Sequence, residues 1–133
     1  MDITNLSQYK ILVVDDEDSQ RMLYAEYLTM EGFTVLQAAD GQEALDKIEA
    51  NQDISVVLLD LMMPKVDGIK VLERIRENPK TKNMSVYMMT VLNRDSVIKK
   101  AYDLDADGYL IKESISPADI KKEIMHAIES KAQ

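Results

Sequence analysis

The sequence has 133 residues, of which 46% are hydrophobic and 30% charged, and it carries a formal net charge of −8 with no cysteine. These values predict one globular domain without disulfides or thiolate metal sites, and the acidic balance argues against direct binding to nucleic acid. No apolar run approaches the roughly 20 residues of a membrane-spanning helix, and the first residues, MDITNLSQYK, have no signal-peptide pattern, so we expect a cytoplasmic protein that does not bind a membrane.

The first quarter of the chain predicts a strand followed by a helix. Residues 11–14 are aliphatic and mostly β-branched, which favours a strand. Leu23, Tyr27 and Met30 follow at helical spacing and predict the apolar face of a helix, and Gly32 stands where that helix should end.

The middle of the chain repeats this alternation. Residues 33–37 predict a second strand, and Asp40 with Glu43 resembles a capping box that opens the second helix. Residues 56–59 are continuously apolar, which is typical of a parallel strand covered on both faces.

The rest of the chain, from about residue 69 onward, adds two strands and three helices. Residues 86–89 and 109–111 predict the strands. Ser116, Pro117 and Asp119 suit the N-cap, N1 and N3 positions of the last helix. Five strands alternating with five helices predict an α/β fold with a parallel sheet, right-handed crossovers and helices on both sides.

Polar residues with reactive groups stand where four of the five predicted strands end. They are Asp15, Asp16, Asp60, Thr90 and Lys112. Ligands of open α/β sheets bind at the carboxyl ends of the strands. A flavodoxin-like strand order of 2-1-3-4-5 would bring these side chains into one cluster.

This cluster predicts metal-dependent phosphoryl chemistry. Three neighbouring carboxylates repel one another, and a hard divalent cation such as Mg2+, or Mn2+ in its place, relieves that repulsion. Asp60 could then attack a phosphoryl group and form an aspartyl phosphate. Thr90 can donate a hydrogen bond and Lys112 a positive charge to the phosphoryl oxygens.

At these residues the chain resembles the response regulator receiver domain family of two-component systems, including the chemotaxis regulators. Four features carry the resemblance: the acidic pair in ILVVDDE, the segment LLDLMMPKVDG, the threonine that ends the fourth strand, and DGYLIK. The resemblance runs from about Lys10 to Ile128. It implies a single receiver domain over residues 1–133 with a flavodoxin-like (βα)5 doubly wound parallel sheet of order 2-1-3-4-5.

The resemblance also implies a signalling switch rather than an enzyme. Asp60 matches the phosphoacceptor, which takes its phosphoryl group from a sensor histidine kinase or a histidine phosphotransfer protein. Asp16 and Asp60 match the carboxylates that bind Mg2+ directly, and Asp15 matches the one that acts through water. Met62 matches the position that gives its backbone carbonyl to the metal.

Further matches concern the phosphoryl group and the output. Thr90 and Lys112 match the residues that contact the phosphoryl group, and Tyr109 matches the aromatic residue whose rotamer reports the phosphorylation state. The face of helix 4, strand 5 and helix 5 would then bind a downstream effector protein or domain, or a second copy in a phosphorylation-dependent homodimer. Pro64 and Gly68 match the turn after strand 3, where glycine permits backbone angles that other residues resist.

The sequence departs from the family pattern at two positions, and two variable positions are also informative. Glu113 follows Lys112 where proline is common, so we expect either a trans bond or a strained one there. Asp105 stands where glycine commonly ends helix 4, and Asp can adopt the left-handed conformation at modest cost. In the family, the positions matched by Met62 and Leu92 flank the path of an attacking water and tune hydrolysis of the aspartyl phosphate. Both residues are apolar here, which predicts slow hydrolysis.

Simpler readings exist for single residues. The acidic run from Asp15 to Asp18 could be a solvated helix cap, Thr90 an ordinary strand residue, and Tyr109 a plain strand aromatic. His126, the one histidine, is expected at the surface without a ligand role.

Other classes of protein fit less well. A flavodoxin needs a phosphate-binding loop after the first strand, and here that loop is DDEDS. The GxGxxG of a dinucleotide-binding domain is absent. A haloacid-dehalogenase-type phosphatase expects an aspartate at position 62. The remaining alternative is a receiver-like interaction module that works without phosphorylation.

Overall fold

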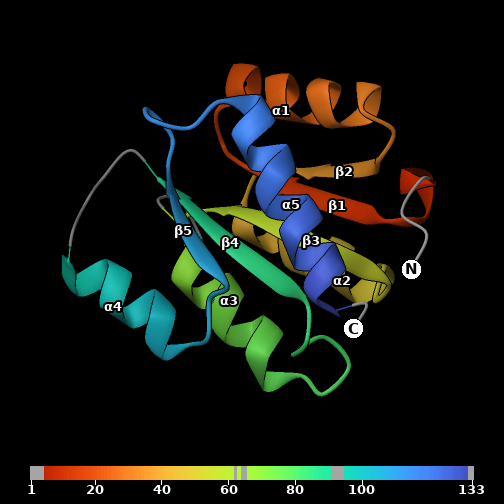
Figure 1. The fold of residues 1–133 in the computed structure, drawn as a ribbon. Helices are drawn as coiled ribbons and strands as arrows, with labels where there is room; N and C mark the ends of the chain where they lie inside the picture. The colour runs from red at the N-terminus through yellow and green to blue at the C-terminus, as the bar shows by residue number, and fades with distance from the viewer. Residues whose placement is uncertain (1–4, 62, 64–65, 91–94, 132–133) are drawn as a thin grey trace.

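The computed structural model describes residues 5–61, 63, 66–90 and 95–131, and it contains a five-stranded parallel sheet (Figure 1). The strand order is β2-β1-β3-β4-β5, so the predicted flavodoxin-like order 2-1-3-4-5 is confirmed. The strands are β1 (Lys10–Val14), β2 (Thr34–Ala38), β3 (Ile54–Asp60), β4 (Ser85–Thr90) and β5 (Gly108–Ile111).

Helices cover both faces of the sheet, as predicted. Figure 1 shows α1 and α5 on one face and α2, α3 and α4 on the other. In the described part of the chain, no helix is long and apolar enough to span a membrane. The helices are α1 (Asp18–Met30), α2 (Gly41–Ala50), α3 (Gly68–Glu77), α4 (Asp95–Asp103) and α5 (Pro117–Lys131), and a short 3-10 helix (Leu6–Gln8) precedes β1.

The central strands divide their side chains between two hydrophobic clusters. In β1, Ile11 and Val13 join the cluster under α1 and α5. Leu12 and Val14 join the cluster under α2 and α3. Successive side chains of a strand point to opposite faces, so a strand buried on both sides must be apolar at every position. This explains the continuous hydrophobic runs of the central strands.

The predicted apolar face of α1 is wrong at Leu23 and Met30, whereas Tyr27 is partly buried against the core. Leu23 is 54% exposed and Met30 is 84% exposed, whereas Tyr24, Ala25 and Leu28 are buried. Apolar residues lie on most sides of this helix, so helical spacing alone selects more than one stripe. The structure selects the stripe that places Tyr24 and Leu28 on the sheet.

Two predicted helix starts are confirmed by their hydrogen bonds. In α5 the Asp119 N–H donates to Ser116 Oγ at 3.1 Å, and the Ser116 N–H donates to the Asp119 carboxylate at 3.2 Å. In α2 the Glu43 N–H donates to the Asp40 carboxylate at 2.8 Å. The Glu43 carboxylate in turn accepts from the Ala39 N–H at 3.0 Å, one residue before the N-cap.

The two departures in the last third of the chain have simple structural outcomes. The peptide bond between Lys112 and Glu113 is trans. Asp105 ends the turn after α4 with a φ of 61°, in the left-handed region. The prediction that aspartate takes over the conformation of a glycine there is confirmed.

Asp105 allows a direct test of this backbone position. We expect Asp105→Gly to raise the free energy of unfolding by about 0.5 kcal/mol, because glycine adopts positive φ without a steric penalty. Asp105→Ala should lower it by about 1 kcal/mol, since alanine keeps the penalty and cannot bond locally. Urea unfolding of the three proteins measures both changes, and equal stability of the glycine and alanine variants would contradict the prediction.

Candidate functional site

The register of the sheet brings the predicted site residues together at one edge. Val14 of β1 pairs with Leu59 of β3. The next residues of these chain segments, Asp15 and Asp60, therefore lie beside each other at the ends of the neighbouring strands. Thr90 pairs with the last residue of β5, and the next N–H, that of Lys112, donates to the Thr90 carbonyl at 2.9 Å. The predicted convergence at the carboxyl ends of the strands is therefore present.

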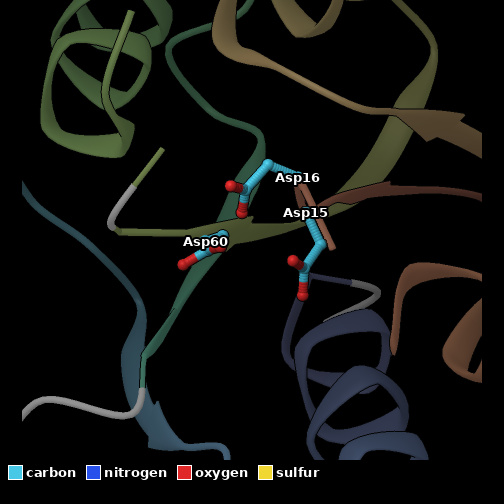
Figure 2. Close-up of side chains that lie close together, drawn as sticks. All are labelled: Asp15, Asp16 and Asp60. Atoms are coloured by element: carbon cyan, nitrogen blue, oxygen red, sulfur yellow. The ribbon is translucent and has the colours of Figure 1, made fainter. Parts of the chain in front are cut away.

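Three carboxylates form the acidic part of the site (Figure 2). One carboxylate oxygen from each of Asp15, Asp16 and Asp60 lies within 4.8 Å of the other two. Asp15 and Asp60 are only 2% and 5% exposed, whereas Asp16 is exposed. The cluster is therefore open to solvent on the side of Asp16.

Lys112 supplies the positive charge of the site. Its Nζ lies 2.6 Å from Asp15 Oδ2 and 3.3 Å from Asp60 Oδ2. Burial alone lowers the pKa of Lys112, but the hydrogen bond to Asp15 and the charge of Asp60 outweigh it, so the pKa is raised. Lys112 is thus a cation at neutral pH that bridges two buried carboxylates.

The donor set suits a hard divalent cation. The three side chains offer carboxylate oxygens, which Mg2+ prefers, and one exposed member leaves room for water ligands. With all three ionised, a single lysine leaves two negative charges uncompensated. A dication at this position would balance them.

The side chains of Thr90 and Tyr109 are hydrogen-bonded to each other. Thr90 is buried at the end of β4. Burial raises the pKa of Tyr109, and a hydrogen bond with the Thr90 side chain acts in the opposite direction. The Tyr109 hydroxyl therefore lies against the residue that is predicted to contact the phosphoryl group.

The glycine that opens α3 is needed for space rather than for backbone angles. The φ of Gly68 is not positive, so the expected reason for this glycine is wrong. A Cβ on Gly68 would lie 2.3 Å from the Asp60 carbonyl oxygen and 2.9 Å from the Leu61 Cα. The N-terminus of α3 is thus packed directly against the backbone of Asp60 and Leu61.

The sequence reasoning missed one residue that contacts the site. Arg21, in the first turns of α1, donates from Nη1 to the Asp15 carbonyl at 3.0 Å. Its side chain is only 13% exposed. The one available signal was a cation five residues after the acidic pair, and sequence alone does not show that it folds back toward the strand end.

Some predicted positions carry no structural test. Met62, Pro64 and Leu92 lie outside the described residues, so the metal-binding carbonyl and slow hydrolysis stay predictions. His126 is exposed on α5, as expected.

Comparisons with known proteins agree with these observations. A family model described as the response regulator receiver domain matches residues 11–125. The chain is 40% identical over 121 residues to the transcriptional regulatory protein ResD of Bacillus subtilis, covering 90% of this chain and 47% of ResD. It is 36% identical over 111 residues to SrrA of Staphylococcus aureus, covering 84% and 44%. The chain thus spans less than half the length of these relatives.

Solved structures show the same fold. The chemotaxis protein CheY4 of Vibrio cholerae has a TM-score of 0.83 and 28% identity, covering 90% of this chain and 98% of CheY4. A structure described as the CheX–CheY–BeF3–Mg2+ complex from Borrelia burgdorferi has a TM-score of 0.81 and 31% identity, covering 90% and 89%.

Proposed function

Because the chain belongs to the response regulator receiver domain family of two-component systems, we propose that it is a phosphorylation switch. Asp60 takes a phosphoryl group from the phosphohistidine of a sensor histidine kinase or a histidine phosphotransfer protein. One observation carries the proposal: the nucleophile candidate Asp60 shares the sheet edge with two further carboxylates, a buried lysine and a buried threonine.

The chemistry requires few groups. A carboxylate oxygen of Asp60 attacks phosphorus, the phosphorus–nitrogen bond of the donor breaks, and the donor imidazole keeps the electron pair and later takes a proton. Mg2+ bound by the three aspartates would supply positive charge against the phosphoryl oxygens. Lys112 is already 3.3 Å from Asp60 and can follow the new negative charge without a large movement.

We propose that the signal leaves the site through Thr90 and Tyr109. Their hydrogen bond gives a direct connection from the phosphoryl position to β5. A shift of Thr90 toward the phosphoryl group would alter its hydrogen bond with Tyr109. The face of α4, β5 and α5 then binds an effector protein or domain, or a second copy of the chain. The relatives ResD and SrrA are named transcriptional regulatory proteins, which is compatible with such an effector.

Small phosphodonors test the proposal directly. Acetyl phosphate with Mg2+ should give a single phosphoryl adduct by intact mass, located on the peptide that contains Asp60, and omission of Mg2+ should prevent it. The adduct should persist after donor removal, because the residues predicted to flank the attacking water are apolar. A lifetime of seconds or less would contradict slow hydrolysis.

A second arm uses beryllofluoride, which mimics the phosphoryl group without covalent chemistry. The chain has 6 tyrosines and no tryptophan, so tyrosine fluorescence reports the change. A folded protein that gives neither adduct nor fluorescence response would overturn the proposal. That result would favour the interaction module that works without phosphorylation.

A further inference from the structure

Arg21 of α1 contacts three different segments around the start of the acidic cluster. Its Nη1 donates to the Asp15 carbonyl at 3.0 Å, and its Nε donates to Gln37 Oε1 of β2 at 3.1 Å. Its Nη2 lies 2.8 Å from the exposed carboxylate of Asp18. The side chain is 13% exposed, so the guanidinium group is held between β1 and β2 rather than free in solvent.

The contact to the Asp15 carbonyl fixes more than one residue. A peptide unit is planar, so the carbonyl of Asp15 and the N–H of Asp16 turn together. The other end of Asp15 is also held, because its N–H donates to the Ala38 carbonyl at 3.1 Å. Arg21 therefore fixes the peptide plane from which Asp16 leaves the backbone.

Asp16 depends on this backbone restraint more than its neighbours do. The Asp15 carboxylate is held by the Glu17 N–H at 2.9 Å and by Lys112 at 2.6 Å. Asp60 is buried beside the same lysine. The Asp16 side chain is exposed, so surrounding side chains do not enclose it, and its direction follows mainly from its backbone.

The positive charge of Arg21 and its geometric restraint have opposite effects on cation binding. The guanidinium group is bound to the backbone carbonyl of Asp15, and a cation at the border of an acidic cluster competes electrostatically with a divalent ion. As a charge alone, Arg21 would weaken cation binding, and its removal would strengthen it. A geometric role predicts the reverse, so the sign of the effect separates the two.

We propose that Arg21 is a positioning residue for the Mg2+ site: it holds the peptide between Asp15 and Asp16 so that the Asp16 carboxylate faces Asp60. The proposal rests on the proposed function of the acidic cluster as a Mg2+ site. Gln37 contributes to this positioning, because its side-chain oxygen accepts a hydrogen bond from Arg21 and so orients the guanidinium group from the neighbouring strand. Metal-site supports of this kind are typically worth 10- to 100-fold in metal affinity.

Three variants test the proposal by calorimetric titration with Mg2+, in the absence of any phosphodonor. Arg21→Lys keeps the charge and loses the forked geometry, Arg21→Gln loses both, and Gln37→Met removes the orienting oxygen without any change in charge. Arg74→Lys, the same replacement at an exposed position of α3, is the matched control. Each titration is made at a temperature at which circular dichroism shows the variant folded, so a purely structural role leaves the dissociation constant unchanged.

We expect Arg21→Lys to raise the Mg2+ dissociation constant by about 10-fold, and Arg21→Gln to raise it less, because the lost positive charge offsets part of the lost geometry. Gln37→Met should give a smaller rise than Arg21→Lys, and Arg74→Lys none. Unchanged binding in Arg21→Lys together with tighter binding in Arg21→Gln would overturn the proposal and leave Arg21 as a charge only. If Arg21→Lys does not fold, Gln37→Met decides, and wild-type affinity in that variant overturns the proposal. A wild-type protein that does not bind Mg2+ would instead overturn the proposed function.

Discussion

Replacement of Asp60 by asparagine should give a protein that forms no phosphoryl adduct and is more stable than the wild type without metal. The loss of the adduct follows from the chemistry, because an amide oxygen is a poor nucleophile and cannot form the acyl phosphate. The gain in stability follows from the electrostatics of the site, and it distinguishes a functional cluster from a structural ion pair.

The balance of charges on Asp60 gives the sign of the stability change. Lys112 attracts Asp60 at 3.3 Å, while Asp15 and Asp16 repel it at distances within 4.8 Å. Coulomb energy falls only with the inverse of distance, so two repulsions at this range outweigh one attraction. The charge is also buried, which adds a desolvation cost. Asparagine removes these penalties, and Lys112 keeps its shorter bond to Asp15.

We expect Asp60→Asn to raise the free energy of unfolding by about 1 kcal/mol, which corresponds to roughly 4 °C in Tm for a chain of this size. Mg2+ should stabilise the wild type by mass action but have little effect on the variant. Thermal unfolding with and without Mg2+, together with intact mass after acetyl phosphate treatment, measures both. Asp46→Asn, the same replacement on the exposed side of α2, is the control and should keep the wild-type thermal stability and the wild-type phosphoryl adduct.

A phosphoryl adduct that persists in Asp60→Asn would refute Asp60 as the acceptor. A large loss of stability without metal would contradict the charge balance. The second outcome would mean that the ion pair with Lys112 outweighs the repulsion within the cluster, and that Asp60 has a structural role in addition to its chemical one.

The strand ends were predictable from sequence because parallel strands impose a simple relation between chain order and space. A buried parallel strand must be apolar at every position, so its end is marked by the first ionisable residue. Asp15 and Asp60 follow such runs directly. Once the strand order is 2-1-3-4-5, both must lie at the same edge, and the observed register places them side by side.

The contacts that hold the site were not predictable in the same way. Gly68 was read as a residue of unusual backbone angles, whereas the requirement is steric and comes from the carbonyl of Asp60. Arg21 belongs to a helix whose buried stripe the sequence left ambiguous, since Leu23 and Met30 are apolar and yet exposed. In both cases the partner is a backbone carbonyl, and a carbonyl has no signature in the sequence.

Replacement of Lys112 by methionine should have the largest effect on stability without metal. The side chains of Lys112, Asp15 and Asp60 are only 7%, 3% and 7% exposed. Methionine has a similar apolar stem but no charge, so it leaves two buried carboxylates without a cation. Removal of one partner of a buried ion pair typically costs roughly 3–5 kcal/mol, and we expect a loss of this size at neutral pH. Lys99→Met, at an exposed position of α4, is the control and should change little.

Mg2+ should restore part of this loss, because a dication bound by the aspartates replaces the missing positive charge. The phosphoryl adduct should nevertheless remain rare, since the cation that contacts the phosphoryl oxygens is absent. Urea unfolding with and without Mg2+ measures the first effect and intact mass the second. Full adduct formation by Lys112→Met would exclude a role for the lysine in phosphoryl transfer.

The pH dependence gives an independent check on Lys112. In the folded protein its pKa is raised above the ordinary value of 10.5, because Asp15 and Asp60 outweigh burial. The stabilisation is therefore complete below pH 10.5 and is lost as pH rises through the raised pKa. The stability difference between wild type and Lys112→Met should be constant from about pH 6 to about pH 9 and should shrink only above that range. Tyr87, whose pKa is raised by burial to about 12, is present in both proteins, so its ionisation cancels in the difference. A difference that grows at alkaline pH would mean that the neutral lysine, rather than the cation, stabilises the folded site.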